Sequence, residues 1–490
     1  MKIFRFFIPI IMVFSFLQSC SGSDDNLTPE EIVPVLSVSS ATVAFDALQS
    51  THTIEIASNT IWKINYTSTW CRPSIQTTKG NAKVIITADA NDTNEDRSTT
   101  FSVSAEGLSD VIITISQKAK GAVVVKPDYI DPDKTGMTSD ALTLAGKMKL
   151  GWNLGNTMEA CDATSAGETM WGNPMTSKNL IDAVKAAGFN VVRIPCAWSG
   201  YIEDAATYKI KESWLARVKE VVDYCVDNDM YVILNIHWDG GWLENNPTYD
   251  KQEAVNIKQK ALWKQISIYF RDYDEHLLFA GTNEVHKDYN TPSTENLTVQ
   301  MSYNQTFVDA VRATGGRNTW RNLIVQAYNT NIDYAVSYLK MPTDGTSKRL
   351  MSEVHFYDPY DFALQEDGAY KTQWGKPFVG GDISAWGQET WVDEAFGKMK
   401  TNFVDKGIPV VLGEYGAILR TSLSTDLQAK HIEARNYYLN YVTKAAKNNG
   451  LIPVYWDNGN TGDKGFALFN RSTAVQVHPD ALNALVSAVK

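Results

Sequence analysis

Short runs of β-branched and aromatic residues, separated by polar turns, fill residues 35–119 of the chain. Alternation of apolar and polar positions inside such runs is typical of strands that bury one face. Strands are predicted at residues 53–56, 83–87, 100–103 and 111–115, with Asn, Asp and Gly between them. Several short strands at this spacing predict a small all-β, immunoglobulin-like sandwich.

A different pattern begins at Met137, where short apolar runs alternate with longer amphipathic segments. This alternation predicts parallel strands joined by crossover helices, for example at residues 216–228 and 256–269. Eight strands are predicted, at residues 150–154, 191–194, 231–236, 277–280, 323–326, 351–354, 410–412 and 453–456. The predicted α/β fold is a (β/α)8 TIM barrel over residues 137–490. Residues 120–136, which contain two prolines and lack periodicity, are predicted to be a linker.

The N-terminal residues have the pattern of an export signal. Lys2 and Arg5 precede an apolar run at residues 6–17 that is too short to span a bilayer. The run ends at Cys20 in a sequence that resembles a bacterial lipobox, which implies a lipoprotein signal peptide at residues 1–19 and lipidation of Cys20. Residues 20–34 would then be a polar tether, and their acidic start resembles the signal for the outer face of the outer membrane. We expect a cell-surface lipoprotein; ordinary secretion with a free N-terminal Cys is the alternative.

Charge and cysteine spacing narrow the classes of partner. A net charge of -11 leaves no broad basic face, which excludes nucleic acid as a partner and favours neutral substrates. Apart from Cys20, the cysteines are Cys71, Cys161, Cys196 and Cys225, without metal-ligand spacing. They are predicted to be buried thiols, although an oxidising compartment would permit a disulfide. No metal and no cofactor are expected, and the protein is expected to be a monomer.

Polar or aromatic residues follow nearly every predicted barrel strand. The C-terminal strand ends of such a barrel meet in one cleft, where active sites lie. The residues at these ends are Asn153, Arg193, His237, Asn283, Glu284, His355, Tyr357, Glu414 and Trp456. Two carboxyl groups suit cleavage of an acetal, which needs one protonated and one ionised carboxyl. We expect Glu414 to raise the pKa of Glu284, while Arg193 and Tyr357 keep Glu414 ionised.

The motifs around these residues resemble glycoside hydrolase family 5. They are Arg193-Ile194-Pro195, Asn235-Ile236-His237, Thr282-Asn283-Glu284, His355-Phe356-Tyr357, Gly413-Glu414-Tyr415-Gly416 and Tyr455-Trp456. The resemblance implies that Glu284 is the acid/base and Glu414 the nucleophile. It further implies support from Arg193, Asn283, His355 and Tyr357, and substrate contacts from Asn153, His237, Trp242, Trp456 and Asn458. Trp374 and Trp386, on long polar loops, are further candidates for the cleft wall.

Residues 151–157, 168–174 and 186–193 resemble subfamily 4 of this family, which contains endoglucanases acting on xyloglucan, mixed-linkage glucan and soluble cellulose derivatives. Trp238 departs from the pattern, because many relatives have a second His there. The implied function is a retaining endo-β-1,4-glucanase, with xyloglucan as the leading substrate. Mixed-linkage glucan, cellulose or β-mannan with the same mechanism is an alternative, as is a non-catalytic surface glycan-binding protein. Retention predicts carboxyl groups about 5 to 5.5 Å apart.

The N-terminal β segment resembles a BACON-type module, an immunoglobulin-like domain found ahead of glycan-degrading domains. The resemblance is carried by residues 36–39, 58–62 and 113–117 together with Trp70. Trp62 and Trp70 are predicted to pack in the core or at an edge rather than to bind sugar. We therefore expect this module to act as a spacer.

Overall fold

The computed structural model describes residues 33–47, 49–120, 126–162 and 164–490. The chain forms two compact units, residues 1–124 and 125–490, and each is described by itself. The predicted signal peptide, Cys20 and most of the predicted tether lie outside the described residues. Within the described part of the chain, no helix combines the length and apolar character needed to cross a bilayer.

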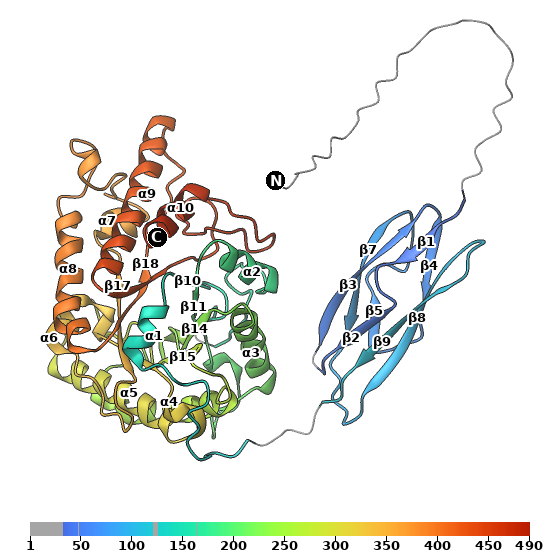
Figure 1. Ribbon diagram of the computed structural model, residues 1–490, viewed down its shortest axis with the longest axis horizontal. Helices are drawn as coiled ribbons and strands as arrows, with labels where there is room; N and C mark the ends of the chain where they lie inside the picture. The colour runs from blue at the N-terminus through green and yellow to red at the C-terminus, as the bar shows by residue number, and fades with distance from the viewer. Residues whose placement is uncertain (1–32, 48, 121–125, 163) are drawn as a thin grey trace, which may run out of the picture. The chain divides into compact units, whose positions relative to one another are not determined.

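The first unit is a sandwich of two sheets (Figure 1). One sheet has the strand order β1 (Leu36–Val38), β3 (Ser50–Ser58), β7 (Ala82–Ala88) and β5 (Cys71–Pro73). The other has the order β2 (Thr42–Phe45), β9 (Val111–Gln117), β8 (Arg97–Ala105), β4 (Ile61–Asn65) and β6 (Thr77–Lys79). Neighbouring strands are antiparallel except β2 and β9, which are parallel. The predicted sandwich is therefore confirmed, with one parallel strand pair that the alternation pattern did not reveal.

The sandwich core contains Trp62, as predicted. Its indole is fully buried and donates a hydrogen bond to the backbone oxygen of Gly80 at 2.8 Å. Trp70 lies at the edge of the core, where the Arg97 guanidinium lies 4.4 Å from its ring centroid. Both indoles thus serve packing within the module.

The second unit is a closed barrel of eight parallel strands. In barrel order these are β10 (Gly151–Asn153), β11 (Val191–Ile194), β14 (Tyr231–Asn235), β15 (Leu277–Ala280), β16 (Leu323–Gln326), β17 (Leu350–Phe356), β18 (Val410–Tyr415) and β19 (Leu451–Tyr455). Each predicted strand overlaps one observed strand. The sixth and seventh extend further than predicted, so His355 and Glu414 lie within strands rather than after them.

Helices cover the outside of the barrel and separate its strands along the chain (Figure 1). The longer ones are α2 (Lys178–Ala186), α3 (Glu212–Val226), α4 (Tyr249–Tyr269), α5 (Thr294–Arg312), α8 (Glu389–Asn402), α9 (Thr425–Asn448) and α10 (Pro479–Ser487). The shorter ones are α1 (Ala141–Lys147), α6 (Ile332–Tyr338) and α7 (Tyr360–Ala363). Apolar residues of α1 pack with side chains from seven barrel strands into one buried cluster. The barrel interior is therefore filled, which leaves the C-terminal strand ends for a cleft.

Residues 126–136, predicted to be part of a linker, pack against the barrel instead. The Lys126 ammonium donates to the backbone oxygen of Tyr269 at 3.0 Å and pairs with Asp272 at 2.7 Å. The Arg271 guanidinium donates to the backbone oxygen of Pro127 at 3.0 Å. Sequence periodicity cannot detect such a segment, because it is held by contacts with distant residues and not by a regular structure of its own.

Candidate active site

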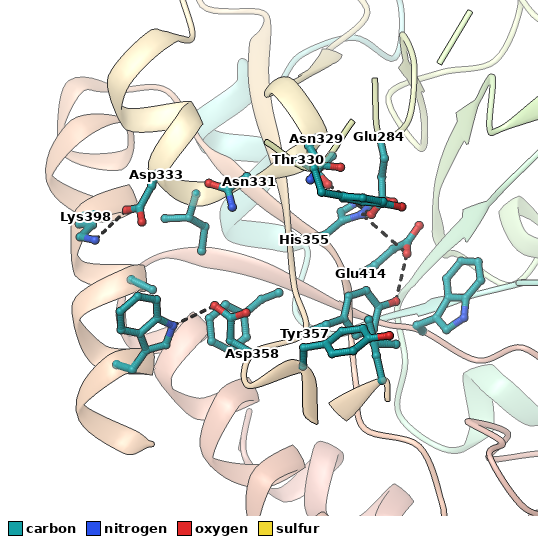
Figure 2. A pocket seen from close by; sticks show the side chains of 18 of the residues that line it. Glu284, Asn329, Thr330, Asn331, Asp333, His355, Tyr357, Asp358, Lys398 and Glu414 are labelled. Carbon is teal, nitrogen blue, oxygen red and sulfur yellow. Dashed lines mark hydrogen bonds and ion pairs between the residues drawn. The ribbon is translucent and has the colours of Figure 1, made fainter. Parts of the chain in front are cut away.

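The cleft is a cavity of about 690 Å³ at the C-terminal strand ends, and its lining includes Glu284, His355, Tyr357, Glu414 and Trp456 (Figure 2). The loop after β16, the first turn of α7 and one face of α8 form its outer wall. The structure thus brings both predicted carboxyl groups into one cavity.

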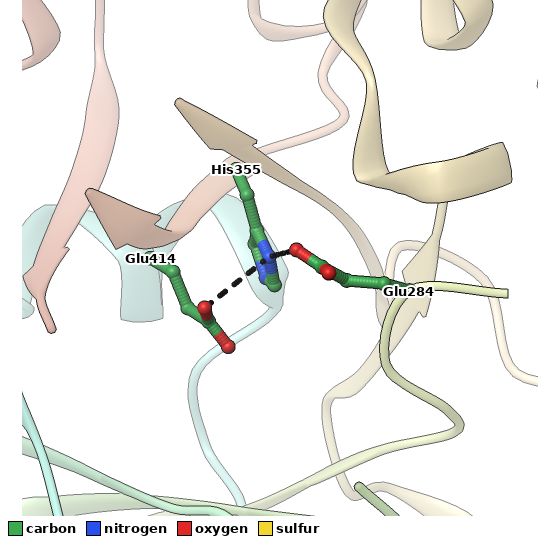
Figure 3. Close-up of side chains that lie close together, drawn as sticks. All are labelled: Glu284, His355 and Glu414. Carbon is green, nitrogen blue, oxygen red and sulfur yellow. Dashed lines mark hydrogen bonds and ion pairs between the residues drawn. The ribbon is translucent and has the colours of Figure 1, made fainter. Parts of the chain in front are cut away.

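Glu284 follows β15 and Glu414 lies in β18, three strands away around the barrel. One carboxylate oxygen of each, together with one ring nitrogen of His355, lies within 4.8 Å of the other two atoms (Figure 3). An inverting enzyme needs a separation of about 6.5 to 9.5 Å to hold a water molecule. The observed spacing instead suits direct attack by one carboxylate, as predicted for retention.

Arg193 connects the groups around Glu414. Its Nη1 atom donates to Glu414 Oε1 at 2.9 Å and to Asn153 Oδ1 at 3.0 Å, and its Nη2 atom donates to Asn283 Oδ1 at 2.8 Å. The Tyr357 hydroxyl donates to Glu414 Oε2 at 3.0 Å. Burial raises the pKa of Glu414, while the positive charges of His355 and Arg193 and the Tyr357 hydroxyl oppose this rise. The predicted partners of Glu414 are therefore in place, but they offset burial and the charge of Glu284 only in part, and the pKa of Glu414 stays above its ordinary value.

His355 changes the expected protonation of Glu284. Its Nδ1 atom lies 2.6 Å from Glu284 Oε1 and 3.7 Å from Glu414 Oε2. Burial alone would lower the pKa of His355, but the surrounding carboxylates raise it to about 10. Burial would likewise raise the pKa of Glu284, yet the hydrogen bond and charge of His355 leave this pKa below its ordinary value. The expectation of a raised Glu284 pKa is wrong for the free site, where the proton lies on His355.

Glu353 is a charged residue of the site that the sequence reasoning missed. It is fully buried, and its Oε1 atom lies 3.0 Å from Arg193 Nε and 3.2 Å from His355 Nε2. Its Oε2 atom accepts from Gln326 Nε2 at 2.6 Å. Glu353 and His355 are two residues apart in β17, so both side chains point into the barrel. A charged residue inside an apolar strand was the signal in the sequence.

One predicted substrate residue, Trp456, lines the cavity, and another, His237, packs against it outside the lining. The Trp456 ring stacks on His237 with centroids 5.9 Å apart and planes 9° apart. Burial and the nearby charge of Arg193 hold the pKa of His237 well below its usual value, so this ring is neutral. The ring centroid of Trp238 lies 6.5 Å from that of the exposed Trp171. Neither of these two indoles is among the residues that line the cavity.

Asn153 serves another purpose than the expected substrate contact, whereas the side-chain oxygen of the half-buried Asn458 is engaged within its own loop. Asn153 is fully buried, and its amide nitrogen donates to the backbone oxygens of Gly413, Val454 and Tyr455. It therefore fixes Arg193 and the strand ends and cannot contact a substrate. The Asn458 side-chain oxygen accepts from the backbone nitrogens of Asn460 and Phe466 at 3.1 Å each, which shapes the loop after β19.

The tryptophans predicted for the cleft wall differ in position. Trp242 lies outside the cavity lining; its indole donates to Asp239 at 2.7 Å, and Lys258 lies 4.1 Å from its ring centroid. Trp374 is fully buried and donates to the backbone oxygen of Gly387 at 2.7 Å, so its assignment to the wall is wrong. Trp386 is 44% exposed and packs edge-on against Trp391, which does line the cavity.

Glu284, His355 and Glu414 form the one group in the described ranges whose ligand atoms are close enough to hold a metal ion. These atoms already pair with one another and with the Arg193 guanidinium and the Tyr357 hydroxyl. A cation would meet the positive charges of Arg193 and protonated His355, so the donor set fits proton transfer better than metal binding.

A closed (β/α)8 barrel with a close carboxylate pair at its strand ends defines a retaining glycoside hydrolase. Residues 155–462 match the family model described as cellulase, glycosyl hydrolase family 5, and residues 60–118 match the BACON model, described as an N-terminal binding domain. The chain therefore belongs to glycoside hydrolase family 5 and carries a BACON module.

Individual relatives agree with this family. A xyloglucan-specific endo-β-1,4-glucanase of Bacteroides ovatus is 43% identical over 99% of this chain and 96% of its own length. Endoglucanase A of Paenibacillus barcinonensis is 40% identical over 71% of this chain and 90% of its own. A solved Bacteroides ovatus family 5 xyloglucanase with a XXXG heptasaccharide matches 93% of this chain and all of its own, with a TM-score of 0.72 and 43% identity. The enzyme is accordingly an endo-β-1,4-glucanase by family and fold.

Proposed function

We propose that this enzyme cuts internal bonds of xyloglucan by a retaining mechanism, with Glu414 as nucleophile and Glu284 as acid/base. The observation that carries this proposal is the pair of carboxylates within 4.8 Å of each other in an open cavity. The Arg193 and Tyr357 contacts to Glu414 fix both of its oxygens, as a nucleophile that must approach one carbon atom requires.

In the first step, a Glu414 oxygen attacks the anomeric carbon, and the bond to the leaving sugar oxygen breaks. That oxygen takes a proton from Glu284, which receives it from His355 Nδ1 across the 2.6 Å hydrogen bond. In the second step, ionised Glu284 removes a proton from water while the water oxygen attacks the same carbon and releases Glu414. Two displacements at one carbon give a product with the starting anomeric configuration.

The extent and the aromatic lining of the cleft support a polymeric sugar substrate. Beyond the carboxylate pair, the cavity extends to the Asp333 and Lys398 ion pair, whose atoms lie 2.7 Å apart (Figure 2). Exposed aromatic rings at Tyr289, Tyr360 and Trp391 line it, and such rings can pack against the apolar faces of sugars. The same substrate is supported by the Bacteroides ovatus relatives, which are named as a xyloglucan-specific endoglucanase and a xyloglucanase.

A substrate panel tests this proposal. Xyloglucan, mixed-linkage glucan, carboxymethylcellulose, glucomannan and xylan are each digested, and the early products are sized. We expect the fastest cleavage of xyloglucan, with large oligosaccharides first and proton NMR showing the β-anomer as the initial product. Faster cleavage of glucomannan or mixed-linkage glucan would make that polysaccharide the assigned substrate in place of xyloglucan. Glucan binding without cleavage would establish a non-catalytic glycan-binding role.

Two single variants test the residue roles. Glu414→Ala and Glu284→Ala are expected to lower kcat by several orders of magnitude while both proteins stay folded. Azide is expected to restore turnover of an activated aryl glycoside by both variants, giving the β-glycosyl azide for Glu284→Ala and the α-glycosyl azide for Glu414→Ala. Wild-type turnover by either variant would reject its assignment.

We further propose that the enzyme is a monomeric lipoprotein of the bacterial outer membrane, facing outward and attached through Cys20. The basic start, the apolar run and the lipobox-like sequence at Cys20 support this localisation. Metabolic labelling with a palmitate analogue should mark the wild type but not Cys20→Ala, and external protease should remove the enzyme from intact cells. Light scattering of the protein lacking residues 1–20 should give the mass of one chain.

A further inference from the structure

Glu244 is a buried carboxylate beside the catalytic pair that takes no direct part in either displacement step. It lies in the loop between β14 and α4 and is 5% exposed. A single oxygen, Oε2, accepts two hydrogen bonds of 3.1 Å, one from Asn283 Nδ2 and one from the backbone nitrogen of Glu284. The His286 backbone nitrogen also donates to the Glu244 backbone oxygen at 2.9 Å. The loops after β14 and β15 are therefore joined directly at the acid/base.

The Asn283 amide is held by a hydrogen-bond donor on one side and a hydrogen-bond acceptor on the other. Arg193 Nη2 is always a donor, so the atom 2.8 Å from it must be the amide oxygen of Asn283. The Glu244 carboxylate accepts from the amide nitrogen on the other side. An amide nitrogen carries two hydrogens, so it can serve Glu244 and a sugar hydroxyl at the same time. The Glu244 contact thus determines where the second hydrogen points.

The negative charge of Glu244 affects the protonation of Glu284. Burial and the neighbouring charge of Glu284 raise the pKa of Glu244 to about 7. The repulsion between the two carboxylates is mutual, so an ionised Glu244 favours the protonated form of Glu284. That form is the one required to protonate a leaving oxygen.

We infer that Glu244 is a positioning residue of the glucanase reaction, which orients the Asn283 amide and the Glu284 backbone through two hydrogen bonds to one carboxylate oxygen. This inference rests on the proposed function. Its effect depends on where the acceptor oxygen lies, because a displacement of about 1 Å in an active site can lower a rate about 100-fold.

Three substitutions of Glu244 distinguish the effect of its acceptor oxygen's position from the effect of its negative charge. Glu244→Gln keeps an acceptor oxygen at the same distance and removes the charge, so kcat on an aryl β-cellobioside is expected to stay within about fivefold of wild type. Glu244→Asp keeps the charge but moves the acceptor oxygen away from its two donors. Glu244→Leu removes both the acceptor oxygen and the charge. Both variants are expected to lose about 30-fold in kcat with KM within about threefold, because the loss affects the transition state more than substrate binding.

Glu159 supplies the matched control. It is also buried, its pKa is also raised to about 7 by burial, and it also accepts two hydrogen bonds, in this case from the backbone nitrogens of Asn156 and Thr157. It contacts neither Asn283 nor Glu284. Glu159→Gln, Glu159→Asp and Glu159→Leu should change thermal stability as the Glu244 variants do, but leave kcat of the folded enzyme within about twofold.

A double variant tests whether Glu244 acts through Asn283. If it does, Glu244→Leu should lower kcat by a smaller factor in the Asn283→Ala enzyme than in wild type, because only the hydrogen bond to the Glu284 backbone nitrogen is then left to lose. Multiplied losses, wild-type activity of Glu244→Asp, or equal losses in the Glu159 series would overturn the inference. Failure of the wild type to cleave any glucan would reject the proposed function instead, so the two failures are distinguishable.

Discussion

Glu353→Gln is the most informative single change in this active site. It replaces one oxygen by an amino group with almost no change in volume. Gln326 cannot turn to accommodate that group, because its own side-chain oxygen accepts from the backbone nitrogen and hydroxyl of Thr282 at 3.0 Å each. The new amide therefore presents a donor either to Gln326 Nε2 or to the Arg193 and His355 nitrogens, and every choice places two donors face to face.

The size of the effect follows from burial. Removing one partner of a buried ion pair costs about 3 to 5 kcal/mol, and Arg193 keeps Glu414 as a second partner, so we expect about 3 kcal/mol. Unfolding of residues 125–490 carries about 2 cal/mol/K of entropy per residue, which translates this loss into a Tm lower by about 4 °C. Because Glu353 also orients His355, kcat should fall by about 100-fold.

Calorimetry and aryl cellobioside kinetics measure both effects, and Asp344→Asn is the control. Asp344 forms a buried, two-bond pair with Arg312 at 2.7 and 2.8 Å, remote from the cleft residues. This control should lower Tm to a similar degree while kcat stays close to wild type. A Glu353→Gln enzyme with unchanged Tm and unchanged kcat would refute the argument that this carboxylate compensates the two cations.

Three further changes probe other parts of the barrel. The pKa of His355 is raised to about 10, so its proton stabilises the fold fully below about pH 6.5, and this contribution is lost as the pH rises to about 10; urea unfolding of wild type and His355→Asn should therefore converge across that range. Trp391→Ala should raise KM for xyloglucan about tenfold, whereas Trp386→Ala, next to it but outside the cavity lining, should change KM less than twofold. Asp239→Asn should lower the free energy of unfolding by about 2 kcal/mol in urea titrations, because its carboxylate accepts from the backbone of Trp198 and Ser199 and the amide would lose an acceptor.

The barrel and its carboxylate pair were predictable because they depend on local pattern. Apolar runs located all eight strands, and strand ends are where polar residues of this fold converge. Glu284, His355, Tyr357, Glu414 and Trp456 were found in this way, and the structure brings all of them to one cavity.

The remaining features depend on neighbours that are distant in sequence. Asn153 has the position of a substrate ligand, but whether its amide faces the cleft or the strand ends depends on three backbone oxygens from β18 and β19. Trp374 lies on a polar loop, yet Tyr437, Tyr438 and Tyr441 of α9 cover it. The pKa of Glu284 likewise depends on which carboxylate lies closer to His355, a difference of about 1 Å that no pattern encodes.

The charge balance of the cleft connects these details to the reaction. Glu244, Glu284, Glu353 and Glu414 are four buried or partly buried carboxyl groups, while Arg193 and protonated His355 supply two positive charges. A glucan is neutral, so the excess negative charge does not strengthen binding of the ground state. It is complementary to the positive oxocarbenium-like centre that develops as the glycosidic bond breaks, and buried carboxylates in a fixed arrangement stabilise that centre without reorganising. The same excess favours a shared proton in the resting site, and the short contact between His355 and Glu284 places this proton one transfer away from Glu284, the residue that protonates the leaving oxygen.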